Sequence, residues 1–335
     1  MLNNLFRRFS LSIIALIGIT LIVFVLSHVV PGDPARLAAG PQARQEQVES
    51  VRKEYGLDKP LPQQYLIYMK NLFTGDLGKS LQSRRPVTDD LRDYFPATLE
   101  LTLFATVIAV IGGVFSGLVS AVRKNQWIDH LNRVVSLAGV SIPVFWLGLV
   151  LVLIFYRSLG WLPFGGRLDP ALSPPAQITG LYILDSLLTA NWPVLWSSLA
   201  YLILPAVTLA FGSLGVVSRM TRASLLDVLQ EDYIRTARGK GLRERVVLMR
   251  HALKNALIPV ITIIGLQFGS LLGGAFLVEV IFSWPGIGTY AMKAIMFLDY
   301  NGIIGVTLLT GIIFMITNLL VDLTYIVIDP RIRAQ

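Results

Sequence analysis

The sequence predicts an all-α protein that crosses a membrane several times. Hydrophobic residues make up 54% of its 335 residues and charged residues only 15%, whereas soluble domains average about 25% charged residues. The apolar residues gather into runs near the roughly 20 residues that one helix needs to cross a bilayer. Basic residues flank these runs, so the positive-inside rule explains the net charge of +8 better than nucleic-acid binding does.

Six apolar runs predict six membrane-spanning helices. The first, residues 9–30, follows Arg7 and Arg8 and is 22 residues long. A cleaved signal peptide has a shorter apolar core of about 7–15 residues, so this run predicts a retained helix whose amino terminus lies in the cytoplasm. The other five runs are residues 98–122, 134–156, 199–217, 257–282 and 303–328.

The loop charges predict how these helices are oriented. Six spans return the carboxyl terminus, with Arg331 and Arg333, to the cytoplasm. The turn at residues 123–133 then lies inside and carries three basic residues and one acid. The outer segments, residues 157–198 and 283–302, together carry three basic residues. This bias is the one that cytoplasmic and external loops of membrane proteins show.

A long polar segment separates the first two runs and is predicted to fold outside the cytoplasm. Residues 42–55 are expected to form an amphipathic helix, and turns are expected at residues 73–80. The predicted organisation is residues 1–30 (amino-terminal end and first helix), 31–97 (extracytoplasmic insert), 98–330 (five-helix core with a loop at 219–256) and 331–335 (cytoplasmic tail).

Residues 219–256 are the longest charged interruption in the second half of the chain. They hold nine basic and four acidic residues, a net charge of +5. Apolar residues recur at every fourth position, which predicts a helix with one apolar face. The residues of this stripe are Leu225, Leu229, Tyr233 and Ala237.

A break is expected at Gly241, because glycine readily adopts the left-handed conformation that ends many helices. Before it, Glu231 and Arg235 are expected to pair across one helical turn. After it, a second helical run is expected from about residue 243 to residue 255. Two short helices joined by a turn form an element suited to contact another protein.

This segment resembles the cytoplasmic EAA loop of ABC-importer permeases, in the branch for dipeptides, oligopeptides and nickel. The resemblance is carried by EDYIRTAR at residues 231–238, KGL at 240–242, RHALKNAL at 250–257 and Pro259. Arg235-Thr236-Ala237 stands where the general pattern has Glu-Ala-Ala. Shorter pieces at residues 31–34, 75–78, 318–323 and 329–333 resemble the same branch.

The resemblance implies a subunit of the bacterial inner membrane that forms half of a translocation pathway. Its partners would be a second homologous permease, two ATP-binding subunits that hold ATP and magnesium, and an extracytoplasmic substrate-binding protein. The implied substrates are di- and oligopeptides, with nickel chelates, glutathione and D,D-dipeptides as alternatives. This chain itself is expected to bind no cofactor.

Two groups of contact residues follow from the resemblance. The first would couple the chain to an ATP-binding subunit and comprises Glu231, Asp232, Tyr233, Arg235, Thr236, Ala237, Arg238, Lys240, Gly241 and Leu242. The second would contact the binding protein and comprises Asp33, Arg44, Asp76 and Trp284.

Missing motifs argue against an enzyme. The sequence contains no G-x-x-x-x-G-K-[ST] phosphate-binding loop, so we expect no ATPase site in this chain. Its three histidines are scattered and it has no cysteine, so neither a metal site nor a catalytic residue is predicted. A secondary transporter is the alternative class, but such proteins usually show internal repeats and midplane charges, and we find neither in the sequence.

Several residues inside the runs predict how the helices pack. Gly113 and Gly117 predict close helix contact, as do Gly265, Gly269 and Gly273. Kinks are expected at Pro143, Pro205 and Pro259.

Three ionisable residues also lie inside the runs. His28 and Glu100 lie near helix ends and are expected to anchor the chain at the membrane interface. Asp322 lies deeper and is expected to pair with Arg331, with Arg333 or with the EAA loop.

Overall fold

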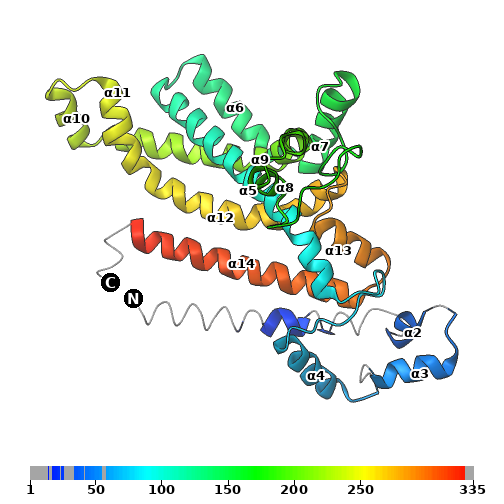
Figure 1. Ribbon diagram of the computed structural model, residues 1–335. Coiled ribbons are helices and arrows are strands. Elements are labelled where there is room, and N and C mark those ends of the chain that lie inside the picture. The colour runs from blue at the N-terminus through cyan, green and yellow to red at the C-terminus, as the bar shows by residue number, and fades with distance from the viewer. Residues whose placement is uncertain are drawn as a thin grey trace. The chain divides into compact units, whose positions relative to one another are not determined.

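The computed structural model describes residues 14, 17–22, 24–25, 34–40, 42–54 and 58–328, with no side-chain description for residues 34, 37, 38, 54 and 321–328. These residues form helices, and no β-strand occurs among them (Figure 1). The helices are α2 (Pro34–Ala39), α3 (Gln45–Glu54), α4 (Leu61–Phe73), α5 (Val87–Val122), α6 (Trp127–Ser141), α7 (Val144–Leu151), the π-helix η1 (Val152–Ser158), α8 (Tyr182–Leu188), α9 (Trp192–Val228), α10 (Asp232–Gly239), α11 (Glu244–Val246), the π-helix η2 (Val247–Ala252), α12 (Leu253–Ile281), α13 (Ile287–Met296) and α14 (Tyr300–Ile328).

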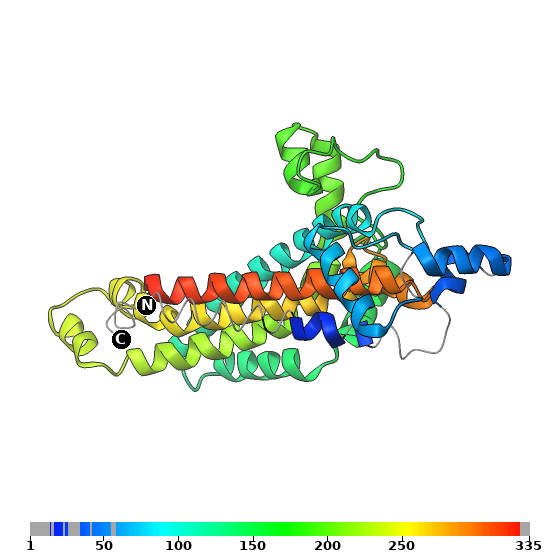
Figure 2. The ribbon, with the colours of Figure 1, turned by 90° about the horizontal axis from the view of Figure 1, so that it is seen from below.

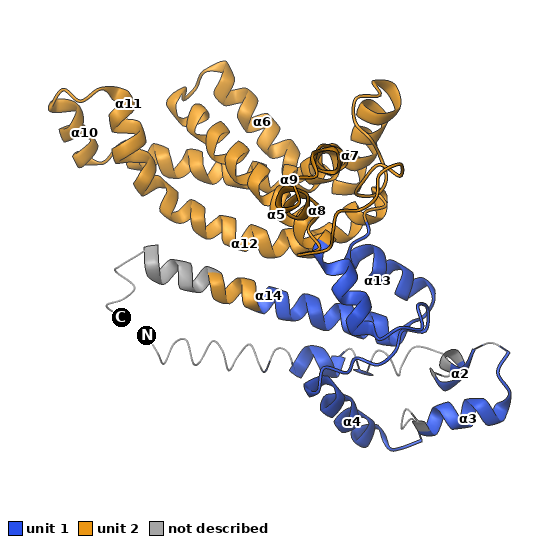
Figure 3. Ribbon diagram, viewed as in Figure 1, with its two compact units in different colours: residues 1–96, 285–315 blue, residues 97–284, 316–335 orange. Residues whose placement is uncertain are grey.

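The chain forms two compact units (Figure 3). Unit 1 comprises residues 1–96 and 285–315, and unit 2 comprises residues 97–284 and 316–335. The boundaries predicted near residues 30 and 97 are of a different kind, because they separate segments by the side of the membrane on which they are expected to lie. They stay predictions.

Four helices of the described residues are long and apolar enough to cross a membrane: Val87–Val122, Trp192–Val228, Glu244–Ile281 and Tyr300–Leu320. They contain the predicted runs at 98–122 and 199–217, all but the last residue of the run at 257–282, and most of the run at 303–328, so these runs are confirmed as helices. The run at 9–30 lies largely outside the described residues. The count of six spans therefore stays a prediction.

The predicted run at 134–156 is not one straight helix. α6 ends at Ser141 and α7 begins at Val144, and the chain bends by 110° between the two halves. The cause is Pro143, which has no N–H and pushes the preceding residue out of the helical region. Ile142 is accordingly extended, with φ −79° and ψ 125°. Pro205 and Pro259 differ, because α9 and α12 continue through them.

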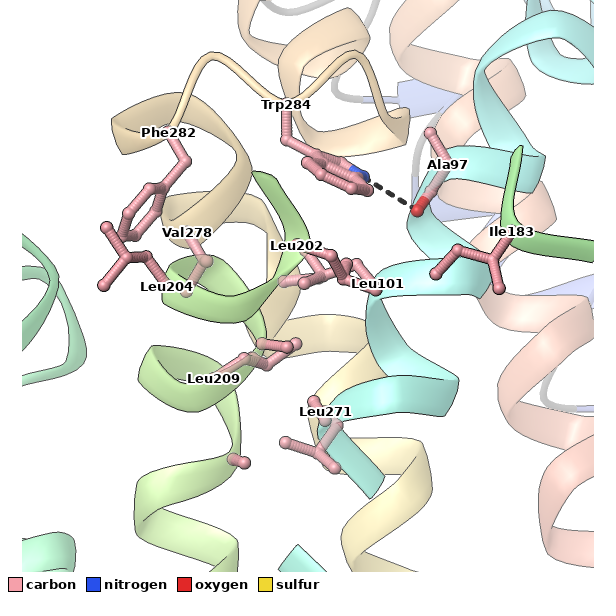
Figure 4. Packing of buried hydrophobic residues seen from close by; sticks show 14 of the residues in the cluster. Ala97, Leu101, Ile183, Leu202, Leu204, Leu209, Leu271, Val278, Phe282 and Trp284 are labelled. Carbon is pink, nitrogen blue, oxygen red and sulfur yellow. Dashed lines mark hydrogen bonds between the residues drawn. The ribbon is translucent and has the colours of Figure 1, made fainter. Parts of the chain in front are cut away.

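α9 is the central helix of unit 2. It packs against α12, α6, α8 and α7. Its leucines join a core to which α5 and α12 also contribute, including Leu101, Leu202, Leu209 and Leu271 (Figure 4). Lipid is as apolar as leucine, so between membrane-spanning helices it is the close packing of these side chains that stabilises the core.

Two glycines bring α5 close to α9. A Cβ placed on Gly113 would lie 2.7 Å from Val217, and one placed on Gly117 would lie 2.5 Å from the carbonyl oxygen of Ser218. Both positions therefore require glycine, which confirms the close packing predicted from their spacing. A Cβ on Gly273 would meet nothing within 4 Å, so this glycine makes no such contact with the residues that the structure describes.

Unit 1 contains α2, α3, α4 and α13 with the neighbouring parts of α5 and α14. α3 confirms the helix predicted within residues 42–55. Val87, Leu91, Ile287 and Tyr290 form a small core. The predicted turns are found as well, with left-handed φ angles of 77° at Gly75 and 76° at Gly78.

Candidate functional site

The basic segment predicted to contact another protein folds as a compact element at one end of α9 (Figure 1). α9 ends at Val228, α10 follows, and a turn leads to α11, η2 and α12. Gly241 has a φ of +75°, so the left-handed break predicted for this residue is confirmed. We call residues 229–252 the α10 loop.

The predicted apolar stripe is only partly correct. Leu225 and Ala237 are buried, but Tyr233 is 42% exposed and its neighbour Ile234 is fully buried. The reason is the turn between Val228 and Asp232, which interrupts the helix and resets its phase. A stripe drawn through one continuous helix therefore points to the wrong residue after the break.

The predicted pair between Glu231 and Arg235 is also wrong. Glu231 immediately precedes α10, with φ −67° and ψ 146°, and its backbone carbonyl, not its side chain, accepts a hydrogen bond from Arg235, at 3.3 Å from the backbone N–H. Arg235 instead contacts Asp232, with 3.2 Å between Nη1 and Oδ1. Both side chains are exposed, and such surface pairs contribute little to stability.

The buried face of α10 joins it to the helices on both sides. Ile234 and Ala237 pack in a cluster with Leu225 of α9, Val247 of η2 and Ala256 of α12. This cluster makes α10 a rigid extension of the ends of α9 and α12.

Two hydrogen bonds reinforce this attachment. Asn255 Nδ2 donates to the Tyr233 hydroxyl at 2.8 Å, and Ser224 Oγ donates to the carbonyl oxygen of Ala256 at 2.8 Å. The first joins α10 to α12, and the second joins α9 to α12.

An ion pair spans the turn at Gly241. Arg238 donates to Glu244 from Nε at 3.1 Å and from Nη2 at 2.7 Å. The hydrogen bonds to Glu244 raise the pKa of Arg238, so this side chain stays charged at physiological pH. The pair connects α10 to α11, and the sequence did not indicate it because the two residues lie on different helices.

The outer surface of the α10 loop combines basic and apolar side chains. The predicted coupling residues are all exposed except Ala237. Exposed apolar residues lie among them, namely Tyr233, Leu242, Val246 and Met249. A cluster of exposed apolar side chains often marks a contact with another protein.

A buried ion pair fixes α6 to α9 near this loop. Asp129 is fully buried and accepts hydrogen bonds from Arg222 Nε at 2.6 Å and Nη2 at 2.8 Å. Ser120 Oγ and the backbone N–H of Asn125 also donate to it, at 2.5 Å and 3.0 Å. In the sequence, the only sign of this ion pair was that Asp129 is the single acid in the basic turn at residues 123–133.

Glu100 has a different role from the predicted interface anchor. Its carboxylate is buried, lies 2.5 Å from Arg167 Nη2 and accepts a hydrogen bond from the Ile183 backbone N–H at 2.8 Å. The Arg167 guanidinium also lies over the Tyr182 ring, with Cζ 3.8 Å from the ring centroid. A carboxylate held in this way is part of the core and not at a lipid surface. The side chains of His28 and Asp322, also discussed from the sequence, lie outside the described residues.

The residues predicted to contact a binding protein come from both units, and this contact stays a prediction. Arg44 and Asp76 are exposed residues of unit 1, where Asp76 Oδ1 accepts a hydrogen bond from the Gly78 N–H at 2.8 Å. Asp33 lies outside the described residues.

Trp284 belongs to unit 2, where its side chain is only 1% exposed. Its indole N–H donates to the carbonyl oxygen of Ala97 at 2.8 Å, as Figure 4 shows. The Trp284 side chain is therefore part of the core of unit 2, whereas its neighbours Ser283 and Pro285 are exposed.

Comparison with known proteins identifies the family. Residues 100–334 match the family described as binding-protein-dependent transport system inner membrane component, and residues 1–102 match the amino-terminal component of the same system.

Three similar proteins illustrate how far the likeness extends. The probable D,D-dipeptide transport system permease protein DdpB of Escherichia coli K12 is 48% identical over 96% of this chain and 94% of its own length. The dipeptide transport system permease protein DppB of Alkalihalophilus pseudofirmus is 46% identical over 99% and 100%. The glutathione transport system permease protein GsiC of E. coli K12 is 42% identical over the full length of both chains. With two family regions that together cover nearly every residue, this chain belongs to the inner membrane components of binding-protein-dependent transport systems.

Proposed function

We propose that this chain is the permease subunit of an ABC importer for short peptides in the bacterial inner membrane, and that it forms half of the translocation pathway. The observation that carries the coupling mechanism is the attachment of α10 to two spanning helices by one buried cluster. A force applied to the outer face of α10 would reach α9 and α12 together, because Ile234 and Ala237 pack in one cluster with buried residues of both helices.

In this mechanism the α10 loop binds an ATP-binding subunit in the cytoplasm. Closure of the ATP-binding subunits around ATP and magnesium moves α10, and the attached helices shift the pathway between two arrangements. Such a switch needs two states whose balance both nucleotide and the loaded binding protein change. Gly241 and the Arg238–Glu244 pair would keep the shape of the loop during the movement.

The assembly would contain a second homologous permease, two ATP-binding subunits and an extracytoplasmic binding protein. The nine basic residues at 219–256 favour a cytoplasmic position for the α10 loop. Both termini would then lie in the cytoplasm and six helices would cross the bilayer. ATP hydrolysis would reside in the partner subunits, because this sequence has no phosphate-binding loop.

Short peptides are the substrate class that the relatives favour. Their names specify D,D-dipeptides, dipeptides, di- and tripeptides, and glutathione. All of these molecules carry an amino group and a carboxylate separated by a small number of bonds. Nickel chelates, the alternative implied by the sequence motifs, do not occur among these names.

Cross-linking in the assembled importer tests the coupling proposal. The chain has no cysteine, so Leu242→Cys introduces a unique thiol on the outer face of the α10 loop. We expect a bifunctional reagent to join this thiol to an ATP-binding subunit, whereas the control Ala171→Cys, in the loop before α8, should give no such product. Modification of Leu242→Cys by a thiol reagent confined to the periplasm would contradict the proposal.

Uptake tests the substrate class. Proteoliposomes that hold the full importer and its binding protein should accumulate a labelled dipeptide when ATP is supplied. An excess of unlabelled tripeptide should reduce this uptake, and an excess of a nickel chelate should not. Competition by the chelate alone would overturn the substrate proposal and leave the coupling proposal standing.

A further inference from the structure

The segment between η1 and the start of α9 presents an apolar surface at the end of α9 opposite to the α10 loop. Figure 2 shows α8 and the loop before it extending to one side of the long helices of unit 2. We call this the α8 surface and define it by Ile178, Leu184, Leu187, Leu188, Trp192 and Trp196, which are all exposed. The charge pattern of the sequence predicted only that this segment lies outside the cytoplasm.

The short helix α8 turns its apolar side outward. Leu184, Leu187 and Leu188 lie three and four residues apart, which places them on one face of the helix, and Leu188 is 59% exposed. The opposite face, with Ile183 and Asp185, is buried. An aqueous surface would favour the reverse arrangement, because exposed leucines gain nothing from contact with water.

Two tryptophans continue this surface along the first turns of α9. Trp192 and Trp196 are 56% and 67% exposed and lie four residues apart, on one face of the helix. Tryptophan is enriched where hydrocarbon meets the polar headgroups, because its ring is apolar and its N–H seeks a polar partner.

The charges of the segment are removed from this surface. Between residues 158 and 218 the only charged residues are Arg167, Asp169 and Asp185. Arg167 is buried against Glu100, and Asp185 is buried and accepts hydrogen bonds from the backbone N–H groups of residues 178–180. Asp169 alone is exposed. The α8 surface itself carries no charge that a charged protein partner would complement.

The position of the tryptophans along α9 matches the thickness of a bilayer. Trp196 precedes Arg219, the next charged residue along α9, by 23 residues. At 1.5 Å per helical residue this corresponds to ~35 Å, close to the hydrocarbon thickness of about 30 Å. If Arg219 marks one boundary of the hydrocarbon, the two tryptophans lie at the other.

From these observations we infer that the α8 surface is embedded in the boundary between headgroups and acyl chains of the lipid leaflet opposite to the α10 loop. The occupant is phospholipid, and the surface anchors the end of α9 at a fixed depth. This inference requires only that the chain spans a bilayer and does not depend on the proposed substrate or coupling mechanism.

Depth-dependent quenching tests this inference in the assembled importer, reconstituted into phosphatidylcholine nanodiscs. Because the chain has no cysteine, Leu187→Cys and Leu184→Cys place single thiols on the α8 surface. Ala171→Cys serves as the control, since Ala171 is exposed in the same segment and is not part of this surface. Each thiol is labelled with a bimane fluorophore, and lipids with a nitroxide near the headgroup or at carbon 5 of the acyl chain are added.

We expect nitroxide lipids to quench both α8 labels at least threefold more strongly than the control label. In the unlabelled variants, a membrane-impermeant maleimide should react at least fivefold more slowly with the α8 thiols than with the control. Equal quenching and equal reactivity at all three positions would show that the α8 surface faces water and would overturn the inference. Protection from maleimide without lipid quenching would overturn it as well, since a protein subunit would then cover the surface. The second α8 position keeps the test decisive if one variant does not assemble.

Discussion

Arg222 on α9 and Asp129 on α6 form a two-point ion pair, with Nε 2.6 Å from Oδ1 and Nη2 2.8 Å from Oδ2. Asp129 is fully buried, so the pair excludes water from its carboxylate. Removing one member of a buried pair costs about 3–5 kcal/mol, because the remaining charge loses its partner. The pair therefore links α6 to α9 a few residues before the α10 loop.

We predict that Asp129→Ala lowers the free energy of unfolding by about 3 kcal/mol, measured as a fall in the thermal unfolding temperature of the purified importer. Asp232→Asn is the matched control, because it removes an exposed carboxylate that also contacts an arginine. The control should unfold at the temperature of the unmodified protein. A stable Asp129→Ala variant would show that the buried pair does not hold α6 and α9 together.

Gly241→Val should uncouple ATP hydrolysis from peptide uptake while the chain still inserts into the membrane. Gly241 has a φ of +75°, and a non-glycine residue held there costs about 1–3 kcal/mol. The turn would therefore change shape and shift the outer face of α10. The measurement is the ratio of peptide taken up to ATP hydrolysed in proteoliposomes.

The matched control for that experiment is Gly239→Ala. Gly239 is the last residue of α10, and a Cβ at this position meets nothing within 4 Å. Its uptake ratio should stay unchanged. If Gly241→Val transports peptide as efficiently as this control, the turn does not transmit the movement.

Gly117→Ala should loosen the contact between α5 and α9. The added Cβ would lie 2.5 Å from the Ser218 carbonyl oxygen, and forcing extra volume into a packed contact typically costs about 1–3 kcal/mol. Gly273→Ala adds the same methyl group where nothing lies within 4 Å and should be neutral. Differential scanning fluorimetry of the two purified variants checks this difference, and equal unfolding temperatures would contradict it.

We predict that the turn before α8 loses stability in acid, because its hydrogen bonds depend on the ionised carboxylate of Asp185. Burial opposes its ionisation, but hydrogen bonds from the Thr179 hydroxyl and from the backbone N–H groups of residues 178–180 outweigh burial and lower its pKa below 3.8. The folded protein therefore favours the ionised form more than the unfolded chain does. The resulting stabilisation is present above pH 3.8 and is lost as the pH falls through the lower, folded-state pKa.

Asp185→Asn should remove this stabilisation at neutral pH. The unfolding temperatures of the unmodified and Asp185→Asn proteins should differ at pH 7 and converge as the pH falls below 3.8. Asp169→Asn changes an exposed carboxylate in the same segment and should unfold like the unmodified protein at both pH values. A difference that persists at low pH would show that the charge of Asp185 is not the cause.

The sequence alone determined the features that depend on neighbouring residues. Runs such as 98–122 and 199–217 are helical because their length and hydropathy are local properties, and the structure places them in α5 and α9. The left-handed turn at Gly241 was also predictable, since glycine adopts that backbone geometry at a lower cost than other residues. The motifs around it were sufficient to indicate the family.

Only the tertiary structure decided which side chains meet. Glu100 and Arg167 are 67 residues apart, and Asp129 and Arg222 are 93 apart. Their pairing depends on which faces of separate helices pack together. Ile234 replaced Tyr233 as the buried residue of α10 because a turn of three residues reset the helical phase. Hydropathy reports how strongly a residue avoids water. Which side chain that residue contacts is decided by the packing of helices that lie far apart along the chain.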